Sequence, residues 1–148
     1  MQTLIRAATQ DDVDALFNIR TSVVQNHLSI EQMADLGITP QVLSASIREA
    51  PCVWIAEVDG KPAAFSMVDL ATGEVFAMFV LPVFENLGLG RQLMTAAEAA
   101  LFERHDTLFL ITDGRDEIRA NGFYKHLGWT VAGPHEGDDV RYEKSRAR

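Results

Sequence analysis

The stretch that decides the fold is Phe79-Val80-Leu81-Pro82-Val83-Phe84-Glu85-Asn86-Leu87-Gly88-Leu89-Gly90-Arg91-Gln92-Leu93. An apolar run ends at Pro82, a short loop follows, and Gly-x-Gly stands where a helix begins. A strand, a glycine loop and a helix in this order place unpaired backbone N–H groups at the positive end of a helix dipole, where phosphate binds. Glycines leave no Cβ in the way of such a ligand. Although paired glycines often mark an ordinary turn, their position here favours a phosphate site.

Two common phosphate motifs do not fit this stretch. No Gly-Lys-Ser/Thr follows the loop, as a P-loop requires, and Leu93 stands where a dinucleotide fingerprint has its third glycine. The stretch instead resembles the pyrophosphate-binding motif of the GNAT superfamily of N-acetyltransferases, in which valine and proline at a strand end precede Gln/Arg-x-x-Gly-x-Gly/Ala. The residues that match are Val80, Pro82, Gly88, Gly90 and Leu93. Glu85 stands where the family has Gln or Arg, and we expect this carboxylate to weaken cofactor affinity without abolishing it.

Composition limits the classes of protein. The chain has 148 residues, 47% of them hydrophobic and 23% charged, which is typical of one soluble domain over residues 1–148. The net charge of −8 argues against binding to nucleic acid or to an anionic membrane. The single cysteine, Cys52, excludes an internal disulfide and indicates a reducing cytosol. Because no signal peptide or bilayer-spanning run is visible, we expect a cytoplasmic protein.

Hydrophobic periodicity and turn residues predict the element order β-α-α-β-β-β-α-β-α-β-β. The expected strands are Leu4–Arg6, Cys52–Val58, Pro62–Asp69, Glu74–Leu81, Leu108–Thr112, Trp129–Val131 and Val140–Glu143. The expected helical regions are one capped at Thr9, a broken one over His27–Glu49, a long one over Gly88–Arg104 and a short one around Ala120–Leu127. This order matches the GNAT arrangement, an α/β (α+β) fold with a mixed, mostly antiparallel central sheet and flanking helices.

A second resemblance lies in residues 119–129. GNAT members commonly show Asn-x-x-Ala-x-x-Phe-Tyr-x-x-x-Gly-Phe here, and the matching residues are Ala120, Phe123, Tyr124 and Gly128. Trp129 replaces the usual aromatic residue, and Glu117 stands where the family often has Asn. Phe-Tyr at helical spacing is by itself typical of a core face, but at this place the resemblance implies that Tyr124 is the general acid. A phenol with a reference pKa of about 10 can protonate the thiolate that leaves when an amine attacks a thioester.

The resemblance also implies how acetyl-CoA binds as the acetyl donor. In GNAT enzymes a bulge splays the strand that ends here at Phe79-Val80-Leu81 from its parallel neighbour, and backbone N–H groups there bond the pantetheine arm and the acetyl oxygen. The expected cofactor-binding residues are Phe79, Val80, Leu81, Leu87, Gly88, Leu89, Gly90, Arg91, Gln92 and Phe123.

Two residues are candidates for the general base. Glu74 opens the motif strand, where the protein-lysine-acetylating branch of the family carries a catalytic Glu, and strand alternation would place it on the same face as Phe76, Met78 and Val80. Glu74 reads equally well as an exposed residue after a turn. His27 titrates near neutrality and is the other candidate.

The acceptor site is expected in the variable first helices, with Asn26, His27 and Phe76 as substrate-binding residues. The histidines show no metal-ligand spacing, so we expect no metal. The sequence thus predicts an acetyl-CoA-dependent N-acetyltransferase that moves acetyl to a primary amine, on a small molecule or a peptide, by direct attack in a ternary complex. Because Glu85 and Glu117 depart from the family pattern, the alternative is a non-catalytic acyl-CoA-binding regulatory module of the same fold. The resemblance also suggests a homodimer, since the final strands often pair between subunits in this superfamily.

Overall fold

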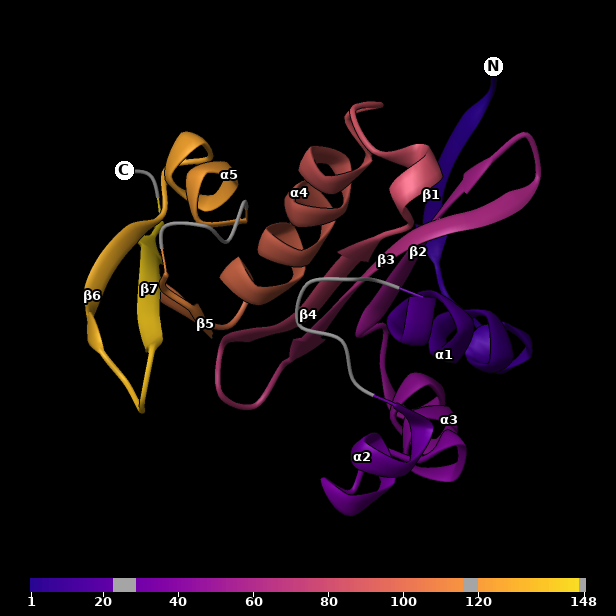
Figure 1. The fold of residues 1–148 in the computed structure, drawn as a ribbon, viewed down its shortest axis with the longest axis horizontal. Coiled ribbons are helices and arrows are strands. Elements are labelled where there is room, and N and C mark those ends of the chain that lie inside the picture. Colours follow the sequence, from indigo (N-terminus) through magenta and orange to yellow (C-terminus); the bar gives the residue numbers. More distant parts are fainter. Residues whose placement is uncertain (23–28, 116–119, 147–148) are drawn as a thin grey trace.

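A single seven-stranded sheet organises the molecule, which we describe from a computed structural model over residues 1–22, 29–115 and 120–146 (Figure 1). The strands follow the spatial order β1-β2-β3-β4-β5-β7-β6, and every neighbouring pair is antiparallel except β4–β5. The strands are β1 (Thr3–Ala7), β2 (Val53–Val58), β3 (Lys61–Asp69), β4 (Glu74–Val80), β5 (Thr107–Asp113), β6 (Thr130–Pro134) and β7 (Asp139–Ser145). The predicted mixed, mostly antiparallel sheet is confirmed.

The helices also follow the predicted order. They are α1 (Val13–Ser22), α2 (Ile30–Asp35), α3 (Pro40–Glu49), α4 (Leu89–Phe102) and α5 (Ala120–His126), with short 3-10 turns η1 (Gln10–Asp12) and η2 (Pro82–Phe84). The broken helical region is α2 and α3. Gly37, with φ 81°, follows α2, and the Thr39 hydroxyl caps α3 by accepting from the Val42 N–H at 3.2 Å.

Local sequence chemistry also explains two other turns, one before the glycine loop in the chain and one after it. Asp59 and Gly60 have φ of 50° and 80°, the left-handed pair that a tight β2–β3 hairpin needs. Gly128, with φ 93°, ends α5, and the Trp129 N–H donates to the Tyr124 carbonyl at 3.1 Å. The hairpin and the C-cap are both as predicted.

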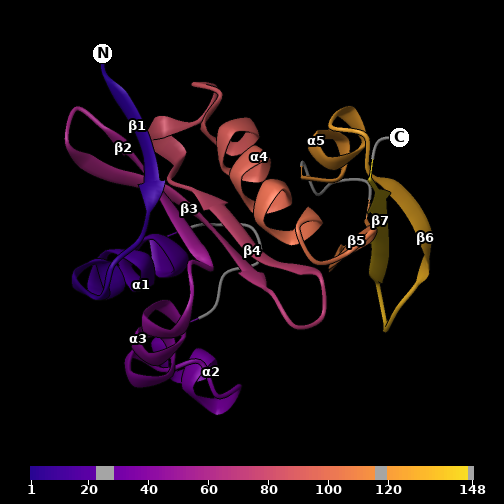
Figure 2. The same cartoon turned by 180° about the vertical axis from the view of Figure 1, so that it is seen from behind.

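The core lies on both faces of the sheet. Helices α4 and α5 cover one face, and α1, α2 and α3 gather beside β2–β4 on the other, away from β5–β7 (Figures 1 and 2). The predicted apolar stripe of α4 is fully buried, with Leu89, Leu93, Ala97 and Leu101 at 1% exposure or less. Ser66 of β3 is also buried and donates to the Leu93 carbonyl at 3.1 Å, which fixes α4 against β3 and β4. No helix within the described ranges has the length and hydrophobicity needed to cross a membrane.

An ion pair joins the first strand to the start of α1. The Arg6 guanidinium donates to both carboxylate oxygens of Asp12 at 2.8 and 2.9 Å, and the Thr9 N–H donates to the same carboxylate at 2.7 Å. The Arg6 contact, the largest cause, lowers the pKa of Asp12 from 3.8 to about 2. A carboxylate whose pKa is lower in the folded than in the unfolded state stabilises the folded protein. This stabilisation is fully present at a pH above the pKa of the unfolded state, and it is lost as the pH falls through the pKa of the folded state.

We therefore predict that Asp12→Asn lowers the free energy of unfolding by about 1 kcal/mol at pH 7, a value reduced by solvent screening because the Arg6 side chain is 33% exposed. The difference from wild type should shrink between pH 4 and pH 2, where Asp12 becomes protonated. Urea unfolding across this range measures it, with exposed Asp14→Asn in α1 as the control. A pH-independent difference would contradict the assignment.

Candidate active site

The loop before α4 presents a run of backbone N–H groups without acceptors. Asn86 and Gly88 have φ of 65° and 78°, so the chain turns through two left-handed residues as it enters the helix. Among the described residues, no acceptor bonds the N–H groups from Asn86 to Arg91, and the first helical bond runs from the Gln92 N–H to the Gly88 carbonyl at 3.3 Å. Successive amides in such a turn, at a helix N-terminus, fit a diphosphate. Of the predicted loop residues, only Gln92 has its amide already engaged.

The two glycines of this loop are required for different reasons. Gly88 is in the left-handed region, and a Cβ there would meet nothing closer than the Gln92 amide at 4.0 Å. Gly90 has an ordinary φ, but a Cβ there would lie 3.2 Å from the Phe123 ring. Gly90 therefore allows α5 to pack against the first turn of α4. Phe123, predicted to bind the cofactor, lies beside this turn.

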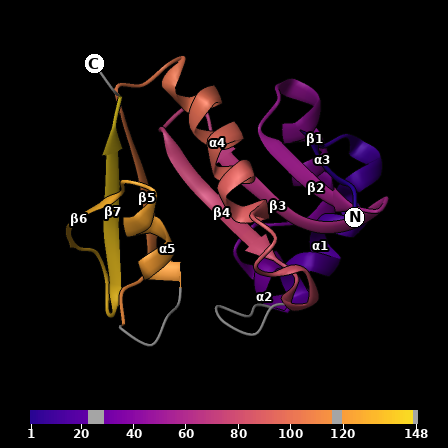
Figure 3. The same cartoon turned by 90° about the horizontal axis from the view of Figure 1, so that it is seen from above.

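Strands β4 and β5 separate beyond their first residues, which matches the predicted splay (Figure 3). Their parallel pairing is restricted to Glu74 opposite Phe109, together with the Phe109 N–H bonding the Gly73 carbonyl at 3.1 Å. Past this point the β5-facing edge of β4 has no strand partner among the described residues. Backbone groups on that edge are available to a ligand between the strands.

The register identifies which amides of β4 face β5. The Leu81 N–H donates to the Ala63 carbonyl of β3 at 2.9 Å, so it is already bonded. Because backbone groups alternate along a strand, the Phe79 N–H also points toward β3, whereas those of Val80 and Met78 point toward β5. Of the three amides expected to bond the acetyl oxygen, only that of Val80 has the required direction. Sequence reasoning missed Met78, because its direction follows from the ladder and not from residue type.

A β-bulge in β4 changes which side chains share a face. Met67 pairs with Ala77 but Val68 pairs with Val75, so Phe76 is an extra residue without a partner on β3. Partners in an antiparallel ladder point to the same face. Met78 therefore faces α4 with its partner Ser66.

Glu74 lies on the opposite face from Met78. Its partner on β3 is Asp69, three residues from Ser66, so Glu74 faces the side covered by α1. The expectation that Glu74 shares a face with Met78 and Val80 was wrong, because the bulge at Phe76 interrupts the alternation.

Glu74 is half-buried at the start of β4. Burial, with the nearby Asp69 carboxylate, raises its pKa, and the charges of Arg141 and His135 partly offset the rise. A carboxylate with a raised pKa is a stronger base than an exposed one, so this environment suits proton abstraction.

Tyr124 lies in α5 within an aromatic cluster, 9% exposed. Its ring centroid is 5.7 Å from that of Phe123 and 5.6 Å from that of Tyr142. Burial, with a smaller contribution from Tyr142, raises the pKa of Tyr124 to about 12, so the phenol is protonated at neutral pH. Among the described residues, the Tyr124 hydroxyl has no hydrogen-bond partner. Every fully enclosed polar side-chain atom in these residues has a partner, so the Tyr124 hydroxyl oxygen must keep some solvent-accessible surface.

Asn121 holds the start of α5 in place. Its side-chain amide donates to the carbonyls of Asp113 and Arg115 at 2.8 and 3.1 Å, and its oxygen accepts from the Tyr142 hydroxyl at 3.0 Å. This buried network ties the end of β5 to the helix that carries Tyr124. The role of Asn121 was not predicted from the sequence. The one feature that indicated it is that Asn121 is a polar residue next to the apolar face of a short helix.

An apolar cavity of about 40 Å³, the acceptor-side cavity, lies on the face of the sheet opposite α4. Its lining includes Phe17, Arg20, Met33, Phe65, Phe76 and Ala77. The Arg20 guanidinium lies 4.1 Å from the centroid of the Phe79 ring, and burial lowers its pKa. The predicted acceptor residue Phe76 is 47% exposed at this cavity, whereas Asn26 and His27, like Glu117 of the second motif, lie outside the described residues.

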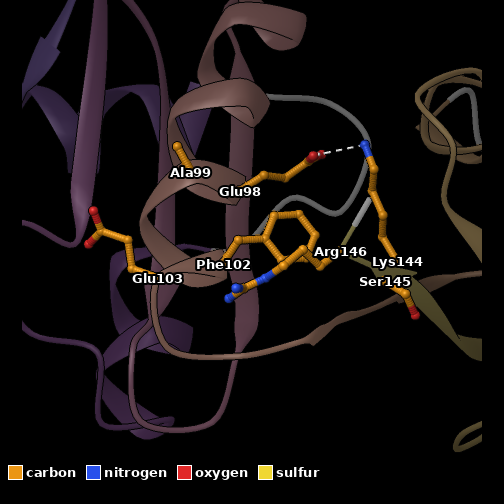
Figure 4. Close-up of a pocket in the computed structure, with 7 residues that line it drawn as sticks. All are labelled: Glu98, Ala99, Phe102, Glu103, Lys144, Ser145 and Arg146. Carbon is orange, nitrogen blue, oxygen red and sulfur yellow. Dashed lines mark ion pairs between the residues drawn. The ribbon is translucent and has the colours of Figure 1, made fainter. Parts of the chain in front are cut away.

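A larger groove, of about 620 Å³, lies between the C-terminal half of α4 and the end of β7 (Figure 4). There Lys144 forms a 2.8 Å ion pair with Glu98, whose other oxygen accepts from the Trp129 indole at 3.1 Å. This groove is far along α4 from the glycine loop and holds none of the predicted site residues. The described ranges also contain no cluster of three or more metal-ligating side chains.

Comparisons with known proteins identify the family. The family described as Acetyltransferase (GNAT) domain matches residues 49–131. An uncharacterized N-acetyltransferase of Archaeoglobus fulgidus is 28% identical over 132 residues, which cover 81% of this chain and 88% of that protein.

Solved structures extend the likeness to the whole chain. PaiA N-acetyltransferase from Thermoplasma acidophilum, solved with coenzyme A, has a TM-score of 0.79 at 17% identity and covers 99% of this chain and 100% of its own. The yncA protein of Salmonella typhimurium, solved with its cofactor acetyl-CoA, has a TM-score of 0.75 at 18% identity and covers 100% of this chain and 96% of its own. Because the family match spans more than half of the sequence and the fold agrees throughout, the chain belongs to the GNAT superfamily of N-acetyltransferases.

Proposed function

We propose that this chain transfers an acetyl group from acetyl-CoA to a primary amine by direct attack within a ternary complex. The observation that carries the proposal is the row of amides without acceptors from Asn86 to Arg91, at one side of the separation between β4 and β5. These amides and the first turn of α4 would hold the diphosphate, with Phe123 beside them. Acetyl-CoA, when bound, supplies a thioester whose carbonyl carbon is the electrophile.

The Met78 and Val80 amides are the candidates for stabilising negative charge on the acetyl oxygen. Both point from β4 toward β5 and have no strand partner among the described residues. Met78 is four residues from Glu74, at most about 13 Å along an extended strand, and Val80 is six residues away, about 20 Å. The Glu74 carboxylate must reach the attacking amine, directly or through one water, while the acetyl oxygen contacts the backbone amide. The shorter separation, that between Glu74 and Met78, makes this easier. We therefore assign the oxyanion contact to the Met78 N–H.

Tyr124 is proposed as the group that donates to the leaving sulfur. Its buried phenol remains protonated at neutral pH, and its hydroxyl is not committed to any other described residue. Asn121 and the Phe123 contact with Gly90 position the helix that carries it. Direct transfer of this kind needs no protein nucleophile. The lone thiol, Cys52, has its pKa raised by burial, which disfavours the reactive thiolate.

Glu74 is proposed as the base that accepts the amine proton. An acceptor amine that resembles lysine has a pKa about three units above neutral, so deprotonation costs roughly 4 kcal/mol. Glu74 faces the side of β4 that carries the acceptor-side cavity, so the amine would approach from there. The acceptor would thus attack from the face opposite α4.

A cytoplasmic location and a homodimer remain proposals. The exposed edge strand β6, where Val131 is 50% exposed, supports pairing between two copies, and the single cysteine supports a reducing compartment.

The direct experiment is to measure thiol release from acetyl-CoA over a panel of primary amines. Turnover with at least one amine, with the acetylated amine identified by mass spectrometry, is the expected result. Tight CoA binding without turnover on any amine would instead favour the non-catalytic module.

We predict that Glu85→Gln lowers the Kd of CoA about two- to fivefold, because the substitution removes a negative charge beside the diphosphate. Isothermal titration calorimetry with CoA at low and high salt measures the change in Kd, which should be smaller at high salt because salt screens the charge. Glu103→Gln removes the same charge from the far end of α4, is exposed, and serves as the control. Equal changes for both variants would show that the diphosphate is not near Glu85.

For Tyr124→Phe we predict a drop in kcat of about 100-fold or more, the range of lost general-acid catalysis, with an unchanged Kd for CoA. The Phe ring keeps the aromatic packing, so the free energy of unfolding should change little. Steady-state kinetics together with CoA titration separate the two effects. Equal rates for variant and wild type would remove Tyr124 as the acid.

Glu74→Gln should lower kcat/KM at neutral pH by about 100-fold and remove the limb of the pH–rate profile on which activity falls as Glu74 is protonated. Because burial raises the pKa of Glu74, this limb should lie above the usual range of a glutamate. Exposed Glu31→Gln in α2 is the control. A profile that keeps the same limb in the Glu74 variant would exclude Glu74 as the base.

A further inference from the structure

We propose that the acceptor-side cavity binds a short apolar side group carried next to the acceptor's amine, about the size of an isopropyl or isobutyl group. The inference rests on the proposed acetyl transfer, for which it names the class of acceptor. It concerns aliphatic primary amines rather than amines with charged or amide side groups.

The chemistry of the walls supports an apolar occupant. Among the described lining residues, Arg20 is the only charged one, and its guanidinium lies against the Phe79 ring. The other described lining residues are all apolar, and they include Phe17, Met33 and Phe65, which are less than 9% exposed. Apart from Arg20, the described lining residues thus offer no polar side chain. A polar side group that enters away from Arg20 therefore loses its hydration without compensation, whereas a hydrocarbon group gains from burial.

The size of the cavity limits the group. One water needs about 10 to 15 Å³ of such volume, so the cavity of about 40 Å³ accommodates roughly three to four non-hydrogen atoms. Isopropyl and isobutyl groups have three and four carbons. A benzyl group exceeds this volume, so it would have to displace the walls.

The position of the cavity limits where the group is attached. Ala77 lines the cavity and precedes Met78, whose amide is proposed to bond the acetyl oxygen. Consecutive Cα atoms are about 3.8 Å apart, so the amine and the apolar group must be separated by only a few bonds. The bulge at Phe76 places that side chain at the cavity, where it remains 47% exposed.

The experiment compares amino-acid amides that share one α-amine. Leucinamide and asparaginamide have nearly the same shape but differ in polarity, glycinamide lacks a side group, and phenylalaninamide carries a larger one. We expect kcat/KM for leucinamide to exceed that for asparaginamide and glycinamide by about tenfold or more, with phenylalaninamide below leucinamide. Titration calorimetry of each amide, with and without CoA, gives a readout independent of turnover, and we expect the same order of affinity.

Two variants alter the cavity. Ala77→Leu fills it and should bring the leucinamide-to-glycinamide ratio close to one. Phe76→Ala removes an exposed rim group, which the fold should tolerate, and should raise phenylalaninamide relative to leucinamide. Ala99→Leu makes the same change as the first variant at an exposed site on α4, on the other face of the sheet, and should leave the ratios at their wild-type values.

The outcomes separate this inference from the function on which it rests. Turnover with equal kcat/KM for leucinamide and asparaginamide would overturn the cavity assignment and leave acetyl transfer standing. Ratios that Ala77→Leu and Phe76→Ala leave unchanged would overturn it as well. If CoA does not bind, the proposed function fails. The cavity would still be supported as a site for an apolar amine if the wild-type protein bound leucinamide selectively and the Ala77→Leu variant did not.

Discussion

The separation of β4 from β5 is the constraint on which the site depends. Parallel neighbours in a sheet ordinarily satisfy each other's backbone groups, and a buried N–H without an acceptor is costly. Here the pairing is limited to the start of the two strands, so the amides of Met78 and Val80 face a space between β4 and β5. The bulge at Phe76 contributes to this, because an extra residue bends the strand and re-aims its groups. The glycine loop leads from the end of β4 into α4, whose first turn packs against Phe123 of α5 at Gly90.

Much of the fold follows from local chemistry that a sequence displays. The Asp59-Gly60 turn, the buried stripe of α4 and the Gly128 cap each depend on residues close together in the chain. The bulge at Phe76 carries no such mark. Glu74–Val80 contains no glycine or proline, and a regular strand would suit it equally well. Its position emerges only from the pairing with β3, which is why the face of Glu74 was assigned wrongly.

The site shows the same division. Gly88 is recognisable from the turn it makes, but Gly90 is required by Phe123, a residue far along the chain. Asn121 acts through carbonyls of Asp113 and Arg115, and its role depends on how β5 ends rather than on its own type. Contacts of this kind are products of tertiary packing, and periodicity or motif spacing does not reveal them. Motif resemblance supplied Tyr124 and Glu74 as candidates, and the structure adds their environments.

Burial of Tyr124 has two opposing consequences in the proposed mechanism. A pKa of about 12 keeps the phenol protonated, but it also makes the phenol a weaker acid than an alkyl thiol such as that of cysteine, whose reference pKa is about 8.5. Complete proton transfer to a solvated thiolate would therefore be uphill. A thiolate formed against the same apolar surroundings is itself destabilised by desolvation, which raises its pKa in the same direction. The aromatic cluster thus reduces the difference between donor and acceptor, and a hydrogen bond from Tyr124 strengthens as charge develops on sulfur, when it aids the reaction.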